Sequence, residues 1–402
     1  MPIATTLPSS SIVLRYPTTS TSTPEVIQEE SYQLLELPAE ILKAVEKSSE
    51  PFPLTIKGRP NDDAVLCTPS TTFLLRTVTI SNSLLILRPP PPRPATATRT
   101  DPTLEIRDTC HQVLECVPQA ASLERIRTVL RESAWEGTGT LGKRKRGDKE
   151  PRRYTREMLG SVIQGSEVEL ERGLKERNVI PYRGRMMLLP LNHLHPLLSL
   201  VLALLTIHHT TIALNESPPT AVSPSRPLQE ALDQDHEIDP EITRGVMGLF
   251  GEMDSDGEVW TCRPAEMVRE IGKGLLGAVK SSGMGLDKLL NDWKEAVGET
   301  WSDLVNVNLL EGDHLLVDPP PAVTSQPRLI VPFPLYQLPL NPATRFADLF
   351  LTRPKWRPDD MIPFLKGLYR DGDSKERDKL VAKFVRVVKE GQGAWWYPRR
   401  SV

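Results

Sequence analysis

The chain has 402 residues, a length that suits roughly two to four domains, and its formal net charge at pH 7 is -3. A charge so close to zero argues against a protein that coats nucleic acid indiscriminately. The charges are nevertheless segregated, because residues 141–190 carry 13 basic and 7 acidic side chains whereas residues 226–318 carry 8 basic and 20 acidic. A single compact enzyme domain would not require this alternation, so the chain is predicted to be modular.

The N-terminal third is predicted to be β-rich after a disordered start. Residues 1–30 are rich in Ser, Thr and Pro and lack a hydrophobic period, so we expect them to be disordered. Across 31–118, apolar runs of five to eight residues alternate with Gly, Pro, Asn and Asp turns, which predicts a small antiparallel sheet or barrel. The expected strands are 32–37, 53–58, 63–68, 72–80 and 84–88, with a short helix at 38–48 and one or two further strands within 104–117. Such a sheet has few inward positions and is expected to complete itself with strands of another chain.

From Ser122 onward the apolar period becomes helical, and the order of elements favours three winged-helix modules in tandem. The first module (119–215) contains expected helices at 155–163 and 167–178, a hairpin over 179–189 and a basic loop at 137–153. The second (225–282) has expected helices at 228–234 and 240–253. The third (284–402) carries an N-terminal extension. The predicted fold class is therefore α+β, with a β-barrel-like assembly domain followed by winged helices.

The last sixty residues carry the strongest candidate site. Helices are expected at 356–369 and 375–389, followed by an aromatic strand over 394–397 that ends in arginine. Residues 341–402 hold 14 basic and 8 acidic side chains, a surplus that predicts contact with nucleic acid or an acidic protein. Pairing with interleaved acidic residues is the alternative explanation for some of these cations. The residues expected to contact backbone phosphates are Lys379, Lys383, Arg386, Arg399 and Arg400.

The basic loop at 137–153 permits two interpretations. Lys143, Arg144, Lys145 and Arg146 form an unbroken cluster that predicts a nuclear localisation signal, although a solvated charge run is the alternative. The preceding Gly137-Thr-Gly-Thr-Leu-Gly-Lys143 partly matches a phosphate-binding loop. Arg144, however, stands where a Ser or Thr would coordinate magnesium, and no strand precedes the loop, so nucleotide binding is not expected.

No other motif predicts catalysis or a cofactor. Glu252-Met-Asp-Ser-Asp-Gly257 resembles the start of a calcium loop, but Arg263 stands where the bidentate Glu is required. The four scattered cysteines include no CxxC pair, and the chain shows no secretory signal, which predicts a reduced intracellular setting. The longest apolar run, 197–207, is too short to span a bilayer and predicts a buried helix. We expect no metal, no cofactor, no catalytic constellation and no membrane partner.

With these residues laid out, the chain resembles the sister-chromatid-cohesion Dcc family (defective in sister chromatid cohesion) across most of residues 31–400. The segments that carry the resemblance are Tyr32-Gln-Leu-Leu-Glu-Leu-Pro, Leu54-Thr-Ile-Lys-Gly, Asp63-Ala-Val-Leu-Cys-Thr, Ser81-Asn-Ser-Leu-Leu-Ile-Leu, Ile163-Gln-Gly-Ser-Glu-Val-Glu-Leu, Arg345-Phe-Ala-Asp-Leu-Phe, Trp356 to Leu365 and Lys383-Phe-Val-Arg. Each segment alone is short, and their order along the chain makes the resemblance specific. The chain departs from the family by its long N-terminus and by the Gly/Lys/Arg insertion at 137–153.

The resemblance implies an accessory subunit of the alternative, chromosome-transmission-fidelity form of the replication factor C clamp loader. It implies that the N-terminal strands join the small chromosome-transmission-fidelity subunit and the tail of the large one in a shared β-barrel. It also implies that the winged helices contact the catalytic subunit of DNA polymerase epsilon and DNA, single- or double-stranded and without sequence preference. Any interaction of this chain with the sliding clamp would be indirect. The residues expected to face the partner subunits are Leu34, Leu54, Ile56, Leu74 and Leu85.

The expected function is therefore a non-catalytic adaptor that serves clamp loading and sister chromatid cohesion in the nucleus. A winged-helix transcriptional regulator is the alternative, and it predicts self-dimerisation and discrimination between base sequences. An enzyme that binds nucleotide at 137–143 is a third possibility, against which Arg144 argues.

Overall fold

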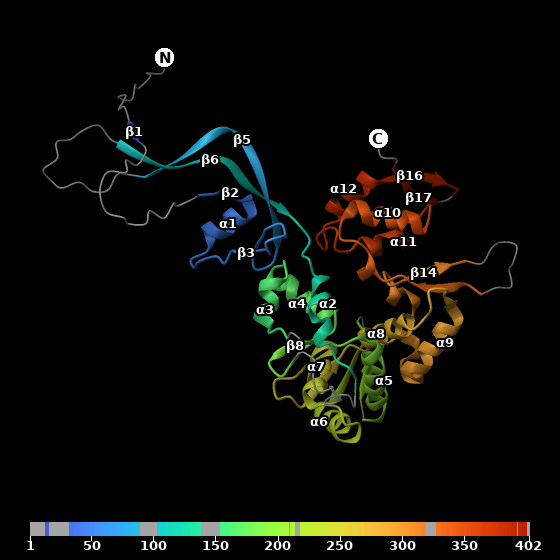
Figure 1. Cartoon of the computed structure of the whole chain (residues 1–402). Helices are drawn as coiled ribbons and strands as arrows, with labels where there is room; N and C mark the ends of the chain where they lie inside the picture. The colour runs from blue at the N-terminus through green and yellow to red at the C-terminus, as the bar shows by residue number, and fades with distance from the viewer. Residues whose placement is uncertain are drawn as a thin grey trace, which may run out of the picture. The chain divides into compact units, whose positions relative to one another are not determined.

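The computed structural model describes residues 13–15, 32–88, 103–137, 153–208, 210–213, 218–318, 327–391 and 393–399. The chain forms two compact units, the first comprising 1–68 and 73–118 and the second comprising 69–72 and 119–402. Helices and several sheets occur together, as the predicted α+β class requires (Figure 1).

The first unit is organised around two long paired strands, β5 (Thr72–Arg88) and β6 (Thr103–Pro118). They run antiparallel and form the twisted ribbon that is prominent in Figure 1. The sheet order is β1-β6-β5-β4-β3, and β2 also pairs with β6. The remaining elements are β1 (Val13–Arg15), β2 (Leu34–Glu36), α1 (Ala39–Lys47), β3 (Thr55–Lys57) and β4 (Val65–Cys67).

The prediction of an antiparallel barrel was wrong in two respects. The sheet is mixed, because β1 and β2 pair parallel to β6, and no sheet formed by the described residues closes into a barrel. The outer strands have only three residues each and do not pair with one another, so the sheet stays open. The turn expected near Ser81 is absent, because β5 continues through it with a register shift between Thr79 and Leu84.

Parts of the predicted N-terminal organisation concern residues that the structure does not describe. Within the segment 1–30, Val13–Arg15 forms a short strand, and the other residues of that segment lie outside the described ranges. Residues 89–102 also lie outside them.

The second unit begins with three helices and a hairpin around one core. Thr155 caps α3 through the backbone N–H of Met158, and Ser166 with Glu169 forms a capping box on α4. Leu159, Leu170 and Leu174 are fully buried at helical spacing, which is why these segments form helices against each other. The elements are α2 (Arg125–Leu130), α3 (Arg156–Val162), α4 (Glu167–Glu176), β7 (Val179–Tyr182) and β8 (Arg185–Leu188).

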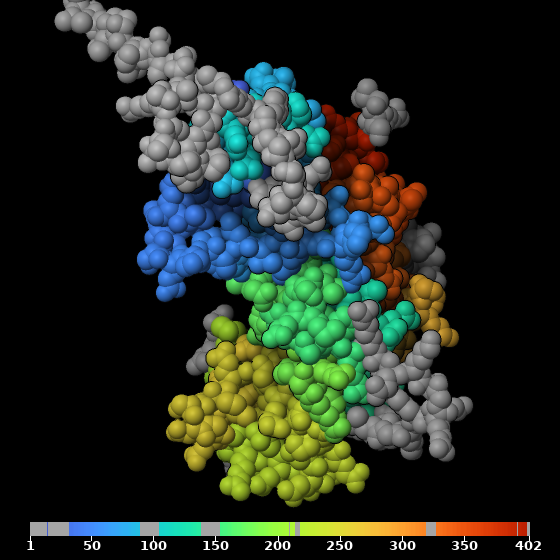
Figure 2. Space-filling view, turned by 60° about the vertical axis from the view of Figure 1, so that its left-hand side comes forward, coloured from blue at the N-terminus to red at the C-terminus, as the bar shows by residue number. Residues whose placement is uncertain are grey.

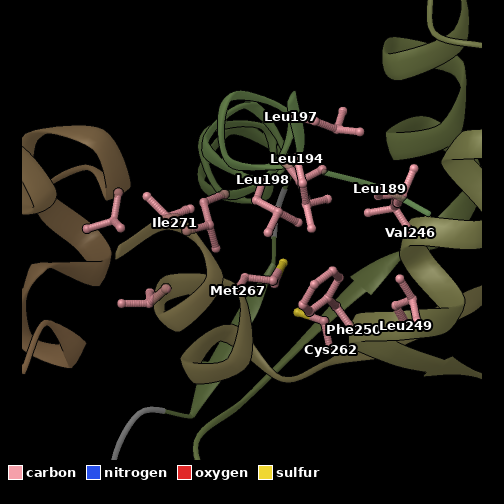
Figure 3. Packing of buried hydrophobic residues seen from close by; sticks show 14 of the residues in the cluster. Leu189, Leu194, Leu197, Leu198, Val246, Leu249, Phe250, Cys262, Met267 and Ile271 are labelled. Atoms are coloured by element: carbon pink, nitrogen blue, oxygen red, sulfur yellow. The ribbon is translucent and has the colours of Figure 1, made fainter. Parts of the chain in front are cut away.

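A larger core follows, centred on α5 (Leu191–Ile207), which contains the apolar run and is buried as predicted. Leu194 and Leu198 of α5 project toward Met267 and Ile271 of α8 (Figure 3). The elements are β9 (Thr211–Ala213), β10 (Thr220–Pro224), α6 (Ser225–Glu230) with a π-helical turn Ala231–Asp235, α7 (Pro240–Phe250), β11 (Gly251–Met253), β12 (Val259–Cys262) and α8 (Pro264–Gly277). The sheet order is β11-β12-β10-β9, so β9, expected in the first module, completes the sheet of the second.

The helix expected to reach Met253 ends at Phe250, because Gly251 adopts extended backbone and starts β11. A Cβ at Gly251 would collide with the indole of Trp260, whose N–H donates to the carbonyl of Met247 at 3.0 Å. Glycine is therefore required at this close approach.

The C-terminal third extends this core and then builds another. Trp293, Trp301 and Ile330 belong to the large core, whereas Phe346, Trp356 and Phe364 belong to a separate C-terminal core. The elements are β13 (Met284–Gly285), α9 (Leu286–Val297), 3-10 turns at Glu299–Leu304 and Val307–Leu310, β14 (His314–Val317), β15 (Leu329–Pro332), a 3-10 turn at Leu335–Gln337, α10 (Pro342–Thr352), α11 (Pro358–Met361), a 3-10 turn at Ile362–Leu365, α12 (Ser374–Phe384), β16 (Val385–Glu390) and β17 (Gly393–Pro398).

Two helix predictions in this region were too long. The helix expected over 356–369 is α11 plus a single 3-10 turn, and Pro363 inside the run removes a backbone donor. The helix expected over 375–389 ends at Phe384. Val385, Val387 and Val388 then favour a strand, because β-branched side chains pack well on a pleated surface.

A buried polar network joins the successive parts of the second unit. The amide of Asn178 donates to Glu270 at 2.8 Å, and Lys273 lies 2.8 Å from the same carboxylate and 3.9 Å from Asp313. Burial raises the pKa of Asp313, although nearby Lys273 and Arg269 oppose this effect. In the space-filling view of Figure 2, the segment from α3 to β8 (green) and the segment from α5 to α8 (yellow-green to yellow) lie against each other.

Within the described ranges, no helix combines the length and apolar character that a membrane crossing needs.

Candidate nucleic-acid interface

The candidate site is presented by α12 and the hairpin β16–β17. Asp373 caps α12 by accepting from the backbone N–H of Glu376 at 2.9 Å, and this hydrogen bond holds the pKa of Asp373 below its usual value. Val381 is buried and Phe384 stacks on Phe346 with ring centroids 4.9 Å apart. This packing fixes the inner face of α12 and leaves the opposite face exposed.

The predicted basic residues occupy that exposed face and its continuation. Lys379 and Lys383 are exposed and one helical turn apart on α12. Arg386 was expected on the helix and instead lies on β16, with its guanidinium 5.8 Å from the ring centroid of Tyr397. Arg400 lies outside the described residues. Lys375, which we did not predict, adds a further exposed cation one turn before Lys379.

Arg399 has a second role that the sequence did not reveal. Its Nη1 donates to the carbonyl of Ala382 at 2.7 Å, and its backbone N–H donates to the carbonyl of Phe384 at 2.9 Å. These carbonyls belong to the last turn of α12, where a cation is favoured by the helix dipole. Arg399 therefore joins the hairpin to the C-terminal end of α12.

Ion pairing separates two groups of cations in this module. Arg370 pairs with Asp373 at 3.2 Å and Arg377 pairs with Asp378 at 2.9 Å, as the alternative explanation required. Lys379, Lys383 and Arg386 form no ion pair with any carboxylate of the described residues. Their charges are consequently available to an external anion.

The outward face of the hairpin carries a cluster that sequence reasoning missed. The ammonium of Lys355 lies 2.6 Å from Glu390 and 4.5 Å from the ring centroid of Trp395, and the guanidinium of Arg357 lies 5.4 Å from the same ring. Glu390 also accepts from the hydroxyl of Tyr397. The sequence signal was Lys355-Trp-Arg357, in which two cations alternate with an aromatic residue.

Mutual hydrogen bonding sets the protonation of this cluster. The bond from Lys355 lowers the pKa of Glu390, and the bond to Glu390 raises the pKa of both Lys355 and Tyr397. Trp396 points inward and is buried, while Trp395 and Tyr397 are half-buried on the outer face. Strand alternation therefore buries only part of this aromatic set.

The residues expected to face partner subunits differ in exposure. Ile56 is 63% exposed and Leu85 is 41% exposed, whereas Leu34, Leu54 and Leu74 are half-buried. Leu54 packs on the small core of the first unit, so it contributes to folding there. Leu84 and Leu87 are also exposed, and because neighbouring strand residues point to opposite faces, this end of β5 is apolar on both sides.

The other predicted motifs can be placed only in part. Lys143 to Arg146 lie outside the described residues, and of the Gly137–Lys143 loop only Gly137 is described. The calcium-like segment is a turn, in which Asp254 accepts from the backbone N–H groups of Glu258 at 2.8 Å and Val259 at 3.1 Å. In the ranges that the structure describes, no three His, Cys, Asp or Glu side chains converge as metal ligands.

The fold and its exposed groups define a modular α+β protein whose distinctive features are an open apolar ribbon and a basic helix-and-hairpin module. The family model described as "Sister chromatid cohesion protein Dcc1" matches residues 32–365. The chain therefore belongs to the Dcc1 family, as the sequence resemblance predicted, and this membership supports a role in sister chromatid cohesion.

Curated relatives agree over most of the chain. The chain is 27% identical over 364 residues to the sister chromatid cohesion protein DCC1 of Xenopus laevis, covering 88% of this chain and 86% of that protein. It is 26% identical over 360 residues to the human protein of the same name, covering 87% and 84%. It is 24% identical over 371 residues to the probable sister chromatid cohesion protein DCC1 of Dictyostelium discoideum, covering 90% and 92%.

Proposed function

We propose that the chain is a non-catalytic adaptor subunit of the alternative, chromosome-transmission-fidelity clamp loader, acting in the nucleus in sliding-clamp loading and sister chromatid cohesion. The exposed, unpaired cations of α12 and β16 carry the DNA-binding part of this proposal. Membership of the Dcc1 family supports the cohesion part. The helix-and-hairpin modules would act as winged helices that link the loader to DNA polymerase epsilon and to DNA.

The apolar end of the β5–β6 ribbon supports the assembly part of the proposal. An open sheet with short outer strands offers unpaired backbone edges, and its exposed leucines offer apolar surface that a partner strand would cover. In this proposal the small subunit and the tail of the large subunit complete the sheet. Co-expression of the full chain with both partners should give a 1:1:1 complex in size-exclusion chromatography with light scattering, and Ile56→Ser with Leu85→Ser should weaken it.

DNA binding is tested by neutralising Lys379, Lys383 and Arg386 together to Ala. If each cation neutralises one phosphate, the slope of log K against log salt should fall by about two to three, and affinity should drop equally for unrelated sequences. Fluorescence anisotropy with labelled duplex and single-stranded DNA over a salt series measures both quantities.

The matched control replaces the exposed Lys280, Lys288 and Lys294, which lie elsewhere in the second unit, with Ala. An equal decrease in salt slope and DNA affinity in this control variant would indicate that positive charge anywhere on the surface contributes to binding. An unchanged salt slope in the Lys379/Lys383/Arg386 variant would remove the proposed interface, and a clear preference for one base sequence would favour a transcriptional regulator.

Nuclear localisation rests on Lys143, Arg144, Lys145 and Arg146. Changing these four residues to Ala in a fluorescently tagged full chain should shift it toward the cytoplasm. Persistent nuclear accumulation would show that the cluster is dispensable for import.

A further inference from the structure

A cavity of about 230 Å³ in the second unit contains an unusual concentration of charged side chains. Its walls come from the start of the first module and α4 on one side and from the segments around Leu340 and Lys366 on the other. The cations that line it are Arg172, Arg177, Arg345, Lys366 and Arg370, and the carboxylates are Glu124, Glu169, Glu176 and Asp371.

Arg345 is the most deeply buried cation in the lining of this cavity, and it is 1% exposed. Its Nε donates to the carbonyl of Pro339 at 2.6 Å, and its Nη1 donates to the carbonyls of Phe364 and Lys366 at 3.3 and 2.8 Å. Its Nη2 makes none of these bonds. Buried arginines are normally paired with a carboxylate, yet Arg345 forms no ion pair with any carboxylate among the residues the structure describes.

The four carboxylates of the cavity are already engaged elsewhere. Glu124 lies 2.5 Å from Arg177, and Asp371 lies 2.9 Å from Arg172. Glu176 also approaches Arg172 and Arg177, at 3.9 and 3.6 Å. Glu169 accepts from Ser166 in the capping box of α4 and from the Thr72 hydroxyl. Arg345 and Lys366 therefore form no ion pair with these carboxylates, although Glu124 still attracts the charge of Arg345 from a distance. The five cations of the lining outnumber its four carboxylates by one.

We propose that this cavity binds a small oxyanion of the phosphate type, held by the free edge of the Arg345 guanidinium with Lys366 at the rim. The guanidinium donors are fixed by three backbone carbonyls, so they are already oriented to form charge-assisted hydrogen bonds with phosphate oxygens. The volume lies below the about 300–1,000 Å³ typical of drug-sized ligands, which suits a compact group. Because the walls come from two parts of the unit, an occupant would join them.

The source of the oxyanion is either free phosphate or a phosphorylated serine side chain, and the test has one arm for each. Inorganic phosphate and a short phosphoserine peptide are titrated into the full chain by isothermal calorimetry at constant ionic strength, with the unphosphorylated peptide and chloride as controls. Binding of either phosphate source, but of neither control, supports the site, and the tighter source identifies the physiological form. Absence of binding by both sources overturns the proposal.

Two surface substitutions locate the site without disturbing Arg345. Lys366→Glu should weaken phosphate binding by about tenfold or more, because it replaces a cation at the rim with an anion. Leu340→Glu, at a cavity position that is 46% exposed, should place a carboxylate near Arg345, raise the Tm without ligand and abolish the response to phosphate.

The matched control is Leu351→Glu on α10, at a position that is 84% exposed and outside the cavity lining. It should bind phosphate like the unmodified chain. Equal binding by the Lys366→Glu, Leu340→Glu and Leu351→Glu variants would contradict this location of the site. Circular dichroism confirms that each variant is folded.

Discussion

The two units of this molecule bury apolar surface to very different extents. In the first unit the fully buried cluster consists of Ile41, Leu66 and Phe73, while Ile56, Leu84, Leu85 and Leu87 stay exposed. In the second unit, large cores surround four tryptophans that are each at most 1% exposed. The second unit buries large apolar cores of its own and leaves scattered side chains such as Leu351 exposed, whereas the first has a small core and a run of exposed leucines at one end of β5.

The four most deeply buried tryptophans of the second unit have paired indole N–H groups, whereas the indole N–H of the buried Trp135 has no partner among the described residues. The indole N–H groups of Trp260, Trp293, Trp301 and Trp356 donate to the backbone carbonyls of Met247, Val268, Leu202 and Leu349, so burial leaves none of these donors unpaired. The outer strands of the first unit instead present sheet edges without a neighbour in the described part of the chain. These open edges are the feature on which the proposed sharing of strands with partner subunits rests.

Replacing one large apolar side chain by alanine in each unit tests this difference in burial most directly. Trp301→Ala removes a fully buried ring and its hydrogen bond to Leu202, and should lower the free energy of unfolding by about 3–5 kcal/mol. Leu85→Ala in the first unit should change it by no more than about 0.5 kcal/mol, because the side chain is partly exposed. Urea unfolding followed by tryptophan fluorescence and circular dichroism measures both. Similar costs at the two positions would refute the contrast.

The buried network of the second unit predicts a comparable but smaller loss. Glu270→Ala leaves the amide of Asn178 and the ammonium of Lys273 without their shared acceptor, and should cost about 3 kcal/mol. The control is Glu266→Ala, one turn earlier on α8, whose carboxylate pairs at the surface with Arg263. Chemical denaturation of both variants gives the difference, and equal effects would show that the network is dispensable.

The free energy of unfolding, measured over a pH series, tests the role of Asp313 in this buried network. The pKa of Asp313 is raised above 3.8 by burial, so its folded form binds a proton more tightly than its unfolded form. Its contribution to stability is complete below about pH 3.8 and is lost as the pH rises through the raised pKa. Asp313→Asn removes this titration, so the variant should gain stability relative to the unmodified chain as the pH rises from about 3.5 to 6.5. A pH-independent difference in unfolding free energy would contradict the assignment.

The smallest expected effect concerns the exposed face of β16–β17. Glu390→Gln removes the carboxylate that pairs with Lys355 and accepts from Tyr397, and should lower the phenol pKa of Tyr397 toward its usual value. It should also strengthen DNA binding modestly, because Lys355 is released to contact phosphate. Ultraviolet titration of tyrosine and fluorescence anisotropy report the two changes. Weaker DNA binding in this variant would show that Glu390 positions Lys355 for the contact.

Local patterns in the sequence predicted many of the elements in both units. The helical spacing of Leu170 and Leu174 and the apolar run of α5 were sufficient to place helices, because they depend on near neighbours. The ends of helices and strands were less predictable where the residues suit a helix and a strand about equally well. Val385, Val387 and Val388 fit a helical period as well as a strand, and only pairing with β17 selects the strand.

The sequence by itself determined the α+β class, the modular charge pattern, the family and the basic character of the C-terminal module. The tertiary structure decided that the N-terminal sheet is open, that Arg377 is paired while Lys379 and Lys383 are free, and that Arg345 is buried without an ion pair to any carboxylate of the described residues. The physical reason is distance along the chain. Helical period and capping act over a few residues, whereas ion pairing, sheet closure and burial depend on segments that only folding brings together.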